Sequence, residues 1–191
     1  MSSQKNNKLQ SSLNTTPPIF KQVCVIGLGL IGASFAQAIK DNGLSARLVA
    51  VDRHAPSITE AIEHGLLDAG SANLQDVIAG SDLIIIAVPV QAVQAVFVDI
   101  KQAIDNGQLA SDCIMTDVCS TKVNIIDAAK AMFGSLPTGL VPAHPIAGAE
   151  NSGYHARRAS LFVNHSVIIC ELPTTSATAI AKLRLLWESV G

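Results

Sequence analysis

Short runs of almost unbroken apolar residues recur along this sequence and constrain its fold more than any other feature. The clearest lie at residues 24–26, 82–88 and 166–170. Strands with one wet face alternate apolar and polar residues, whereas strands covered on both faces do not. Longer amphipathic stretches separate the runs, and this alternation favours parallel pairing with right-handed crossovers. The sequence therefore predicts an α/β fold, a doubly wound parallel sheet of the Rossmann type.

The composition of the 191 residues agrees with such a sheet. Hydrophobic residues make up 49% of the chain and charged residues 15%, against roughly 25% charged in an average globular protein. Aromatic residues are only 4%, so the core must consist mainly of Ala, Val, Ile and Leu. This profile excludes an intrinsically disordered chain and a charge-rich coiled coil.

Charge and hydropathy also limit the partners that we expect. The formal net charge is −2, and no cluster of Lys and Arg stands out, so neither nucleic acid nor an anionic membrane surface is favoured. The longest apolar run, 83–90, contains Pro89 and is far shorter than the ~20 residues of a membrane span. The N-terminus lacks the apolar core of a signal peptide. We therefore expect a cytoplasmic protein with no nucleic-acid or membrane partner.

One domain is expected over residues 21–191, after a polar tail at 1–20 that ends in two prolines and is predicted to be disordered. Strands are expected at 23–26, 47–51, 82–88, 113–117, 140–143 and 166–170. Helices are expected at 30–42, 57–64, 74–79, 92–104, 121–133 and 176–190.

A glycine-rich turn follows the first predicted strand and opens the first helix. It reads Gly27-Leu28-Gly29-Leu30-Ile31-Gly32, a GxGxxG pattern in the context that gives it meaning. The first glycine permits the tight turn, the second lets the backbone approach a pyrophosphate, and the third lets helix and strand pack closely. The free N–H groups at the start of the helix, which include those of Leu30 and Ile31, would then face the anion. The alternative is a tight turn without a ligand.

The second predicted strand ends at Asp52, twenty residues beyond the last of these glycines. A carboxylate there can accept hydrogen bonds from both ribose hydroxyls and repels a 2′-phosphate, which favours NAD over NADP. Arg53 could instead stack on adenine or pair with a 2′-phosphate. Val88 and Pro89, at the end of another strand, are expected to form a wall of the cofactor site or to be ordinary strand punctuation.

Two further strand ends carry polar groups that a core would not tolerate. In the segment 116–122, Ser120 or Thr121 can cap the next helix, and Cys119 is expected near the ligand as a bystander. His144 ends a strand before Pro145, where a neutral imidazole could accept a hydroxyl proton near pH 7. Its alternative is a structural histidine. Cys24, Cys113 and Cys170 lie in apolar strand-like runs and are expected to be structural free thiols, with no zinc site and no disulfide framework.

The motifs GLGLIGASFA, VDRH, IIIAVPV, TDVCSTK and HPIAGAENSG, in this order and spacing, resemble the prephenate dehydrogenase family of tyrosine biosynthesis. The resemblance runs from about residue 22 to 191. The family usually has Gly where this chain has Cys119, and often Gly where it has Ala143; neither change removes a reacting group.

The resemblance implies an NAD-dependent oxidative decarboxylation of prephenate to 4-hydroxyphenylpyruvate. His144 would bond the ring hydroxyl and help to remove its proton, Ser120 would contact that hydroxyl and the nicotinamide side, and Glu150 would act in an ionic gate. Asp52 would bind the ribose. It also implies a helical domain, expected to be absent from this chain, that dimerises and completes the substrate site. Arogenate or both cyclohexadienyl substrates are alternatives, as are a β-hydroxyacid dehydrogenase and a dinucleotide-binding module without turnover.

Overall fold

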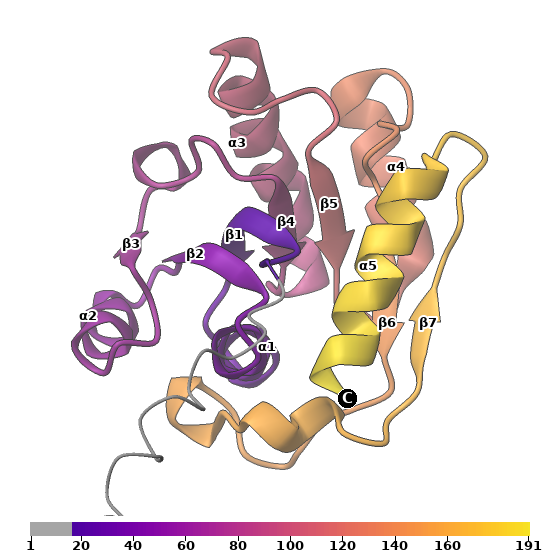
Figure 1. Cartoon of the computed structure of the whole chain (residues 1–191). Helices are drawn as coiled ribbons and strands as arrows, with labels where there is room; N and C mark the ends of the chain where they lie inside the picture. Colours follow the sequence, from indigo (N-terminus) through magenta and orange to yellow (C-terminus); the bar gives the residue numbers. More distant parts are fainter. Residues whose placement is uncertain (1–16) are drawn as a thin grey trace, which may run out of the picture.

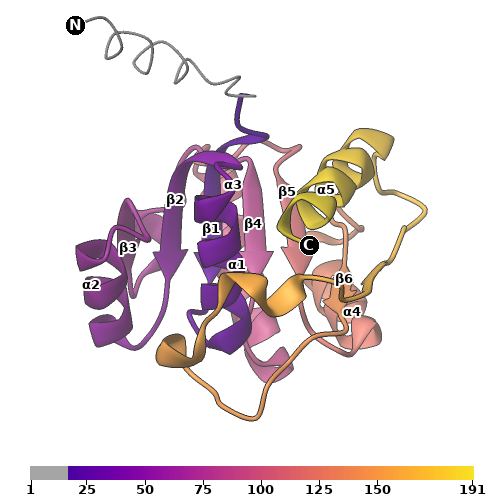
Figure 2. The ribbon, with the colours of Figure 1, turned by 60° about the horizontal axis from the view of Figure 1, so that its bottom comes forward.

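A five-stranded parallel sheet forms the centre of the computed structural model, which describes residues 17–191 (Figure 1). The strand order is β3-β2-β1-β4-β5, with helices on both faces. Strands β2, β1, β4 and β5 point the same way, with α1 in front of them (Figure 2). The predicted fold class is therefore confirmed.

The elements follow the predicted alternation closely. The parallel strands are β1 (Phe20–Ile26), β2 (Ser45–Val51), β3 (Ala69–Ser71), β4 (Leu83–Ile86) and β5 (Ile114–Asp117). The α-helices are α1 (Leu30–Asp41), α2 (Ala55–Glu63), α3 (Val93–Asp105), α4 (Lys122–Phe133) and α5 (Ala177–Val190). Short 3-10 helices are η1 (Leu74–Asp76), η2 (Val90–Ala92), η3 (Tyr154–Ala156) and η4 (Ala159–Phe162).

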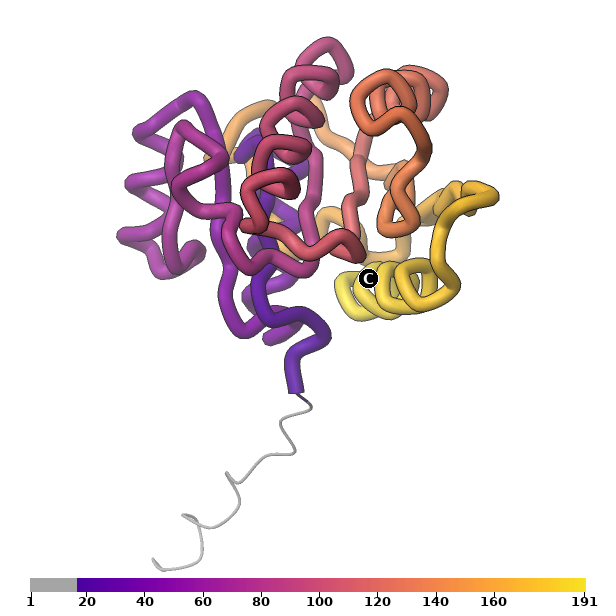
Figure 3. The backbone as a smooth tube through the Cα atoms, turned by 90° about the horizontal axis from the view of Figure 1, so that it is seen from above, coloured from indigo at the N-terminus to yellow at the C-terminus, as the bar shows by residue number. Residues whose placement is uncertain are grey.

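The central strand β1 is buried on both of its faces. Val23 and Val25 belong to a hydrophobic cluster with α1 and α5, whereas Cys24 and Ile26 belong to a second cluster with α3 and α4. Helices α3 and α4 lie side by side over that second face (Figure 3). Because successive side chains of a strand point to opposite faces, each of the residues 23–26 enters one of the two clusters, and all four are apolar. This is the physical basis of the unbroken apolar runs.

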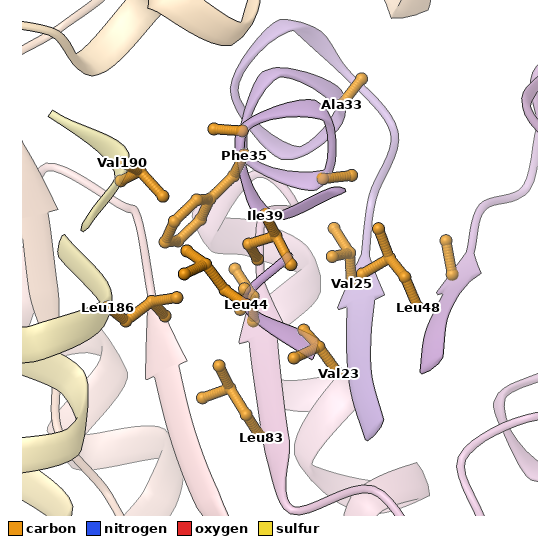
Figure 4. Close-up of a cluster of buried hydrophobic side chains, with 14 of the residues drawn as sticks. Val23, Val25, Ala33, Phe35, Ile39, Leu44, Leu48, Leu83, Leu186 and Val190 are labelled. Carbon is orange, nitrogen blue, oxygen red and sulfur yellow. The ribbon is translucent and has the colours of Figure 1, made fainter. Parts of the chain in front are cut away.

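Three aromatic rings join the first face to the C-terminal helix. Phe35 of α1 stacks on Trp187 of α5 with ring centroids 4.3 Å apart, and Phe162 of η4 lies within 5.4 Å of both rings. Figure 4 shows the Phe35 ring directed toward Leu186 and Val190. Three of the few aromatic residues of this chain therefore lie together where α5 packs against the domain. Such ring pairs contribute more stability than the burial of their apolar surface alone.

The last two strands depart from the prediction of a single parallel sheet. β6 (Ala143–Pro145) and β7 (Val167–Ile169) form a separate antiparallel pair. Before β6, the chain forms a single parallel bridge to β5, between Met115 and Leu140. Pro142 and Pro145 lack the N–H that a continued ladder needs, and the Pro142 carbonyl instead accepts from the Cys170 N–H at 2.8 Å.

Two other expectations need correction. β3, which was not predicted, pairs with β2 as a three-residue edge strand whose sequence, Ala-Gly-Ser, gives no strand signal. The tail predicted for residues 1–20 reaches too far, because Phe20 starts β1 and is 1% exposed. The rest of that prediction, at residues 1–16, lies outside the described residues.

A hydrogen-bond network closes the amino-terminal edge of the sheet. The buried Gln22 Nε2 donates to the carbonyls of Val77 and Ala79 and to Ser81 Oγ, at 2.8 to 3.1 Å. Its Oε1 accepts from Arg47 Nη1 at 2.9 Å. Both ends of this amide are therefore satisfied, as a buried polar group requires.

No helix within residues 17–191 has the length and apolar character needed to cross a membrane.

The two faces of α5 give a test of its packing. Leu183 is fully buried, whereas Leu185 on the same helix is 50% exposed. Leu183→Ala should lower the free energy of unfolding by about 2–5 kcal/mol, because it removes a buried side chain and leaves a cavity. The control Leu185→Ala should change it by no more than about 0.5 kcal/mol. Urea denaturation measures both, and equal effects would show that α5 does not pack as described.

Candidate active site

A pocket of about 570 Å³ lies at the carboxyl ends of β1, β2 and β4. Ligands on open α/β sheets bind at this edge. Six of the residues predicted to bind a cofactor line this pocket, namely Gly27, Gly29, Asp52, Arg53, Val88 and Pro89. Further lining residues come from the loop after β3 and from α3.

The three glycines of the turn have different surroundings. Gly27 has a φ of +100°, and a Cβ there would lie 2.6 Å from the Ala87 carbonyl oxygen. A Cβ on Gly32 would collide with the Gly27 carbonyl, so strand and helix meet without room for a side chain. A Cβ on Gly29 would meet no atom within 4 Å. No contact within the protein therefore requires glycine at position 29. The reason predicted from the sequence, close approach of a pyrophosphate, is compatible with this open space.

Leu30 and Ile31 lie in the first turn of α1 and do not line the pocket. Both are half-buried and pack against the hydrophobic cluster on the α1 face. Gly29 precedes the helix without a side-chain cap, so the first N–H groups of α1 are available to an anion. What these two residues can offer a ligand is their backbone.

Asp52 is fixed between the glycine turn and the loop after β2. Its Oδ2 accepts from the Leu28 N–H at 2.5 Å and its Oδ1 from the His54 N–H at 2.7 Å. A carboxylate offers about four lone-pair sites, so both oxygens can still accept from ribose hydroxyls. Arg53 is exposed at the same wall and makes no ion pair within residues 17–191.

Sequence reasoning missed the part of the pocket that follows β3. Asn73 and Leu74 line it there, and Ala95, Val96 and Asp99 of α3 close it on another side. The loop after a third parallel strand reaches the ligand edge in a doubly wound sheet, but β3 has no strand signal in its sequence, so sequence reasoning could not locate the first group.

A second group of polar residues surrounds the end of β5. Asp117, which is fully buried, accepts from the Cys119 N–H at 2.9 Å and from Lys122 Nζ, and Lys122 Nζ also donates to the Ala143 carbonyl at 2.6 Å. Burial raises the pKa of Asp117, while the Lys122 ammonium and nearby backbone N–H groups oppose that rise. Ser120 is exposed in the turn between these residues.

The turn that holds Ser120 touches the pocket without lining it. Cys119 Sγ lies 3.5 Å from the carbonyl oxygen of Val88, a pocket residue. Thr121 is the residue that precedes α4, but its side chain makes no capping hydrogen bond. The cap predicted for Thr121 is therefore not formed. Burial raises the pKa of Cys119 to about 11, which keeps this thiol protonated at neutral pH and agrees with a bystander.

The sequence predicted that His144 lies at the end of a strand. In the structure it is instead the central residue of the short strand β6. Its side chain is half-buried, and the buried Nδ1 has no hydrogen-bond partner among the described residues. Lys122 Nζ, which contacts Asp117 at the end of β5, donates to the carbonyl of the preceding residue, Ala143, and so joins the backbone of β6 to the end of β5. His144 does not line the pocket itself.

The remaining predicted site residues are less constrained. Glu150 is exposed in the loop after β6 and forms no ion pair within residues 17–191. All four cysteines are free, and burial raises the pKa of Cys24 and Cys113 to about 12. In the described part of the chain, no group of three or more His, Cys, Asp or Glu side chains is placed to hold a metal ion.

Comparison with known proteins finds one family model, the nucleotide-binding domain of prephenate dehydrogenase, which matches residues 35–191. The cyclohexadienyl dehydrogenase of Zymomonas mobilis is 36% identical over 174 residues, which are 91% of this chain and 57% of that protein.

Two solved structures share the fold. The prephenate dehydrogenase of A. aeolicus, in complex with hydroxyphenyl propionate and NAD+, superposes with a TM-score of 0.78 at 25% identity and 90% coverage of this chain. The Synechocystis arogenate dehydrogenase gives 0.78 at 28% identity and 89% coverage. The chain spans 57% of the length of each of these relatives.

Two glycine substitutions separate folding from nucleotide binding. Gly29→Ala should leave thermal stability unchanged but weaken NAD binding roughly tenfold or more, because its methyl group enters the space reserved for the pyrophosphate. Gly32→Ala should instead lower the free energy of unfolding by about 1–3 kcal/mol through overpacking. Thermal unfolding and calorimetric NAD titration measure the two effects. Unchanged NAD affinity in Gly29→Ala would place the nucleotide elsewhere.

Proposed function

The chain belongs to the prephenate dehydrogenase family, whose nucleotide-binding domain model matches most of it, and we propose that it oxidises prephenate with NAD. In this reaction a hydride leaves the carbinol carbon of the ring, the hydroxyl loses its proton, and carbon dioxide leaves from the opposite carbon. The product is 4-hydroxyphenylpyruvate. The observation that carries the proposal is the glycine-lined pocket at the carboxyl ends of the parallel strands, which also contains Asp52.

The pocket suits a dinucleotide whose adenosine ribose carries no 2′-phosphate. Asp52 offers lone pairs to the ribose hydroxyls, and the open space over Gly29 with the uncapped start of α1 suits a pyrophosphate. When bound, NAD supplies the hydride acceptor. The chain then has to hold the ring in place, exclude water and accept one proton.

His144 is the proposed proton acceptor. A general base needs a nitrogen within hydrogen-bond reach of the hydroxyl that it deprotonates. The half-buried imidazole has a buried Nδ1 that finds no partner within residues 17–191, so its hydrogen bonds are not all used within this part of the chain. Ser120, exposed in the neighbouring turn, is proposed to contact the same hydroxyl, and Glu150 to gate the entrance.

Arogenate is the second candidate substrate. Support comes from relatives described as cyclohexadienyl dehydrogenase and arogenate dehydrogenase. The two substrates differ at the side chain remote from the ring hydroxyl, so the residues described here serve both. Homodimerisation through a helical domain and a cytoplasmic location stay predictions.

Calorimetric titration with NAD, followed by an assay of NADH formation, tests the proposal. We expect NAD binding and turnover of prephenate, arogenate or both. Binding without turnover would support the alternative of a dinucleotide-binding module that needs a further domain. Turnover of a hydroxyacid but of neither cyclohexadienyl compound would overturn the proposed reaction.

Replacement of the imidazole tests its role as base. His144→Asn should leave NAD affinity nearly unchanged and reduce kcat by roughly two to four orders of magnitude, as the loss of a general base does. The control His64→Asn alters an exposed histidine at the end of α2 and should change neither quantity. Wild-type turnover in His144→Asn would remove this residue from the mechanism.

The carboxylate of Asp52 tests the choice of dinucleotide. Asp52→Asn keeps an acceptor for the Leu28 N–H but loses the charge, and should weaken NAD binding by roughly ten- to a hundredfold while affecting NADP much less. Asp105→Asn, at an exposed site, is the control. Equal weakening of both dinucleotides would show that Arg53 governs the preference.

A further inference from the structure

We propose that Lys122, together with Asp117, is a positioning residue that holds Ser120 and His144 in one fixed arrangement. The inference rests on the proposed function for the roles of those two residues. It adds a pair of groups that do not line the nucleotide pocket and that determine where the reacting side chains lie.

The first half of the arrangement is the turn that carries Ser120. Asp117 ends β5 and is 0% exposed. Its Oδ2 accepts the Cys119 N–H at 2.9 Å and also contacts Lys122 Nζ. The carboxylate therefore holds the turn from inside, on the residue immediately before Ser120.

The second half is the strand that carries His144. Lys122 Nζ donates to the Ala143 carbonyl at 2.6 Å, on the residue immediately before His144. Among residues 17–191, the backbone bonds between segment 139–145 and β5 are those of Met115, which accepts from the Val141 N–H and donates to the Gly139 carbonyl. Beyond that point the chain pairs with β7 instead. The ammonium group thus joins the end of β5, the start of α4 and the strand of the imidazole.

Stability alone is a poor explanation for this buried pair. The Lys122 side chain is 16% exposed and that of Asp117 0%, and a buried ion pair is often no more stabilising than apolar residues of the same volume. However, the pair bonds to the residue before Ser120 and to the residue before His144, so it fixes the backbone position of both. Displacement of a catalytic group by about 1 Å can cost roughly a hundredfold in rate, and such supporting contacts set that position.

The main experiment compares Lys122→Met with Lys130→Met. Lys130 lies on the same helix, α4, and is exposed, so its variant controls for loss of one positive charge. The NMR signals of the His144 ring, assigned with His144→Asn, report the position of the imidazole. We expect Lys122→Met to shift or broaden these signals while NAD affinity stays within about twofold of wild type. Lys130→Met should leave them in place. A His144 signal in Lys122→Met that coincides with wild type would overturn the proposal.

A second variant separates positioning from simple loss of stability. Lys122→Met leaves the Asp117 carboxylate buried without its cation, which is destabilising. The double variant Asp117→Asn/Lys122→Met removes that charge and should recover thermal stability without restoring the His144 signals. Recovery of both together would show that the pair is only a stabilising contact, and the proposal would fail.

Turnover provides the last readout. With prephenate, Lys122→Met should lose roughly ten- to a hundredfold in kcat with little change in KM, because ground-state binding does not involve it. A raised KM at unchanged kcat would contradict positioning. If the wild-type protein oxidises no cyclohexadienyl substrate, the proposed function fails, but the comparison of ring signals still decides whether Lys122 positions His144.

Discussion

Burial of the central strands on both faces is the constraint on which the rest of this structure depends. Val25 and Ile26 are adjacent in sequence, yet they enter separate hydrophobic clusters on opposite sides of the sheet. Because neither face of the sheet is exposed to solvent, polar functional side chains are confined to the ends of the strands. This explains in one step the low charge of the chain, its aliphatic core, and the position of its pocket.

The carboxyl edge is divided between two tasks. The ends of β1, β2 and β4 form a pocket whose glycines and carboxylate suit a dinucleotide, while the end of β5 holds the buried pair Asp117 and Lys122. The two parts meet where Cys119 contacts the Val88 carbonyl. Under the proposed function, cofactor recognition and placement of the reacting groups would therefore come from different strands.

Most of the fold and much of the pocket were predictable because apolar periodicity and the glycine turn are local signals. β3 was missed because its three residues carry no such signal, and the glycine at its centre is required by a neighbour: a Cβ on Gly70 would lie 2.5 Å from Ile58 Cγ2. The antiparallel pair β6–β7 was mistaken for part of the parallel sheet, since pairing partners are a tertiary property. Lys122 was visible as a motif residue, but its bond to Ala143, 21 positions away, is not written in any local pattern.

The opposite edge of the sheet has a different character. The Gln22 side chain makes four hydrogen bonds there, three to the segment between η1 and β4 and one to β2, and no ligand is needed to complete them. These bonds link β1 to its neighbours at the edge away from the pocket. Laboratory evolution of a new substrate preference therefore has a natural starting point: loops beyond the carboxyl ends can be randomised as a library, while the amino-terminal edge is left untouched as the scaffold.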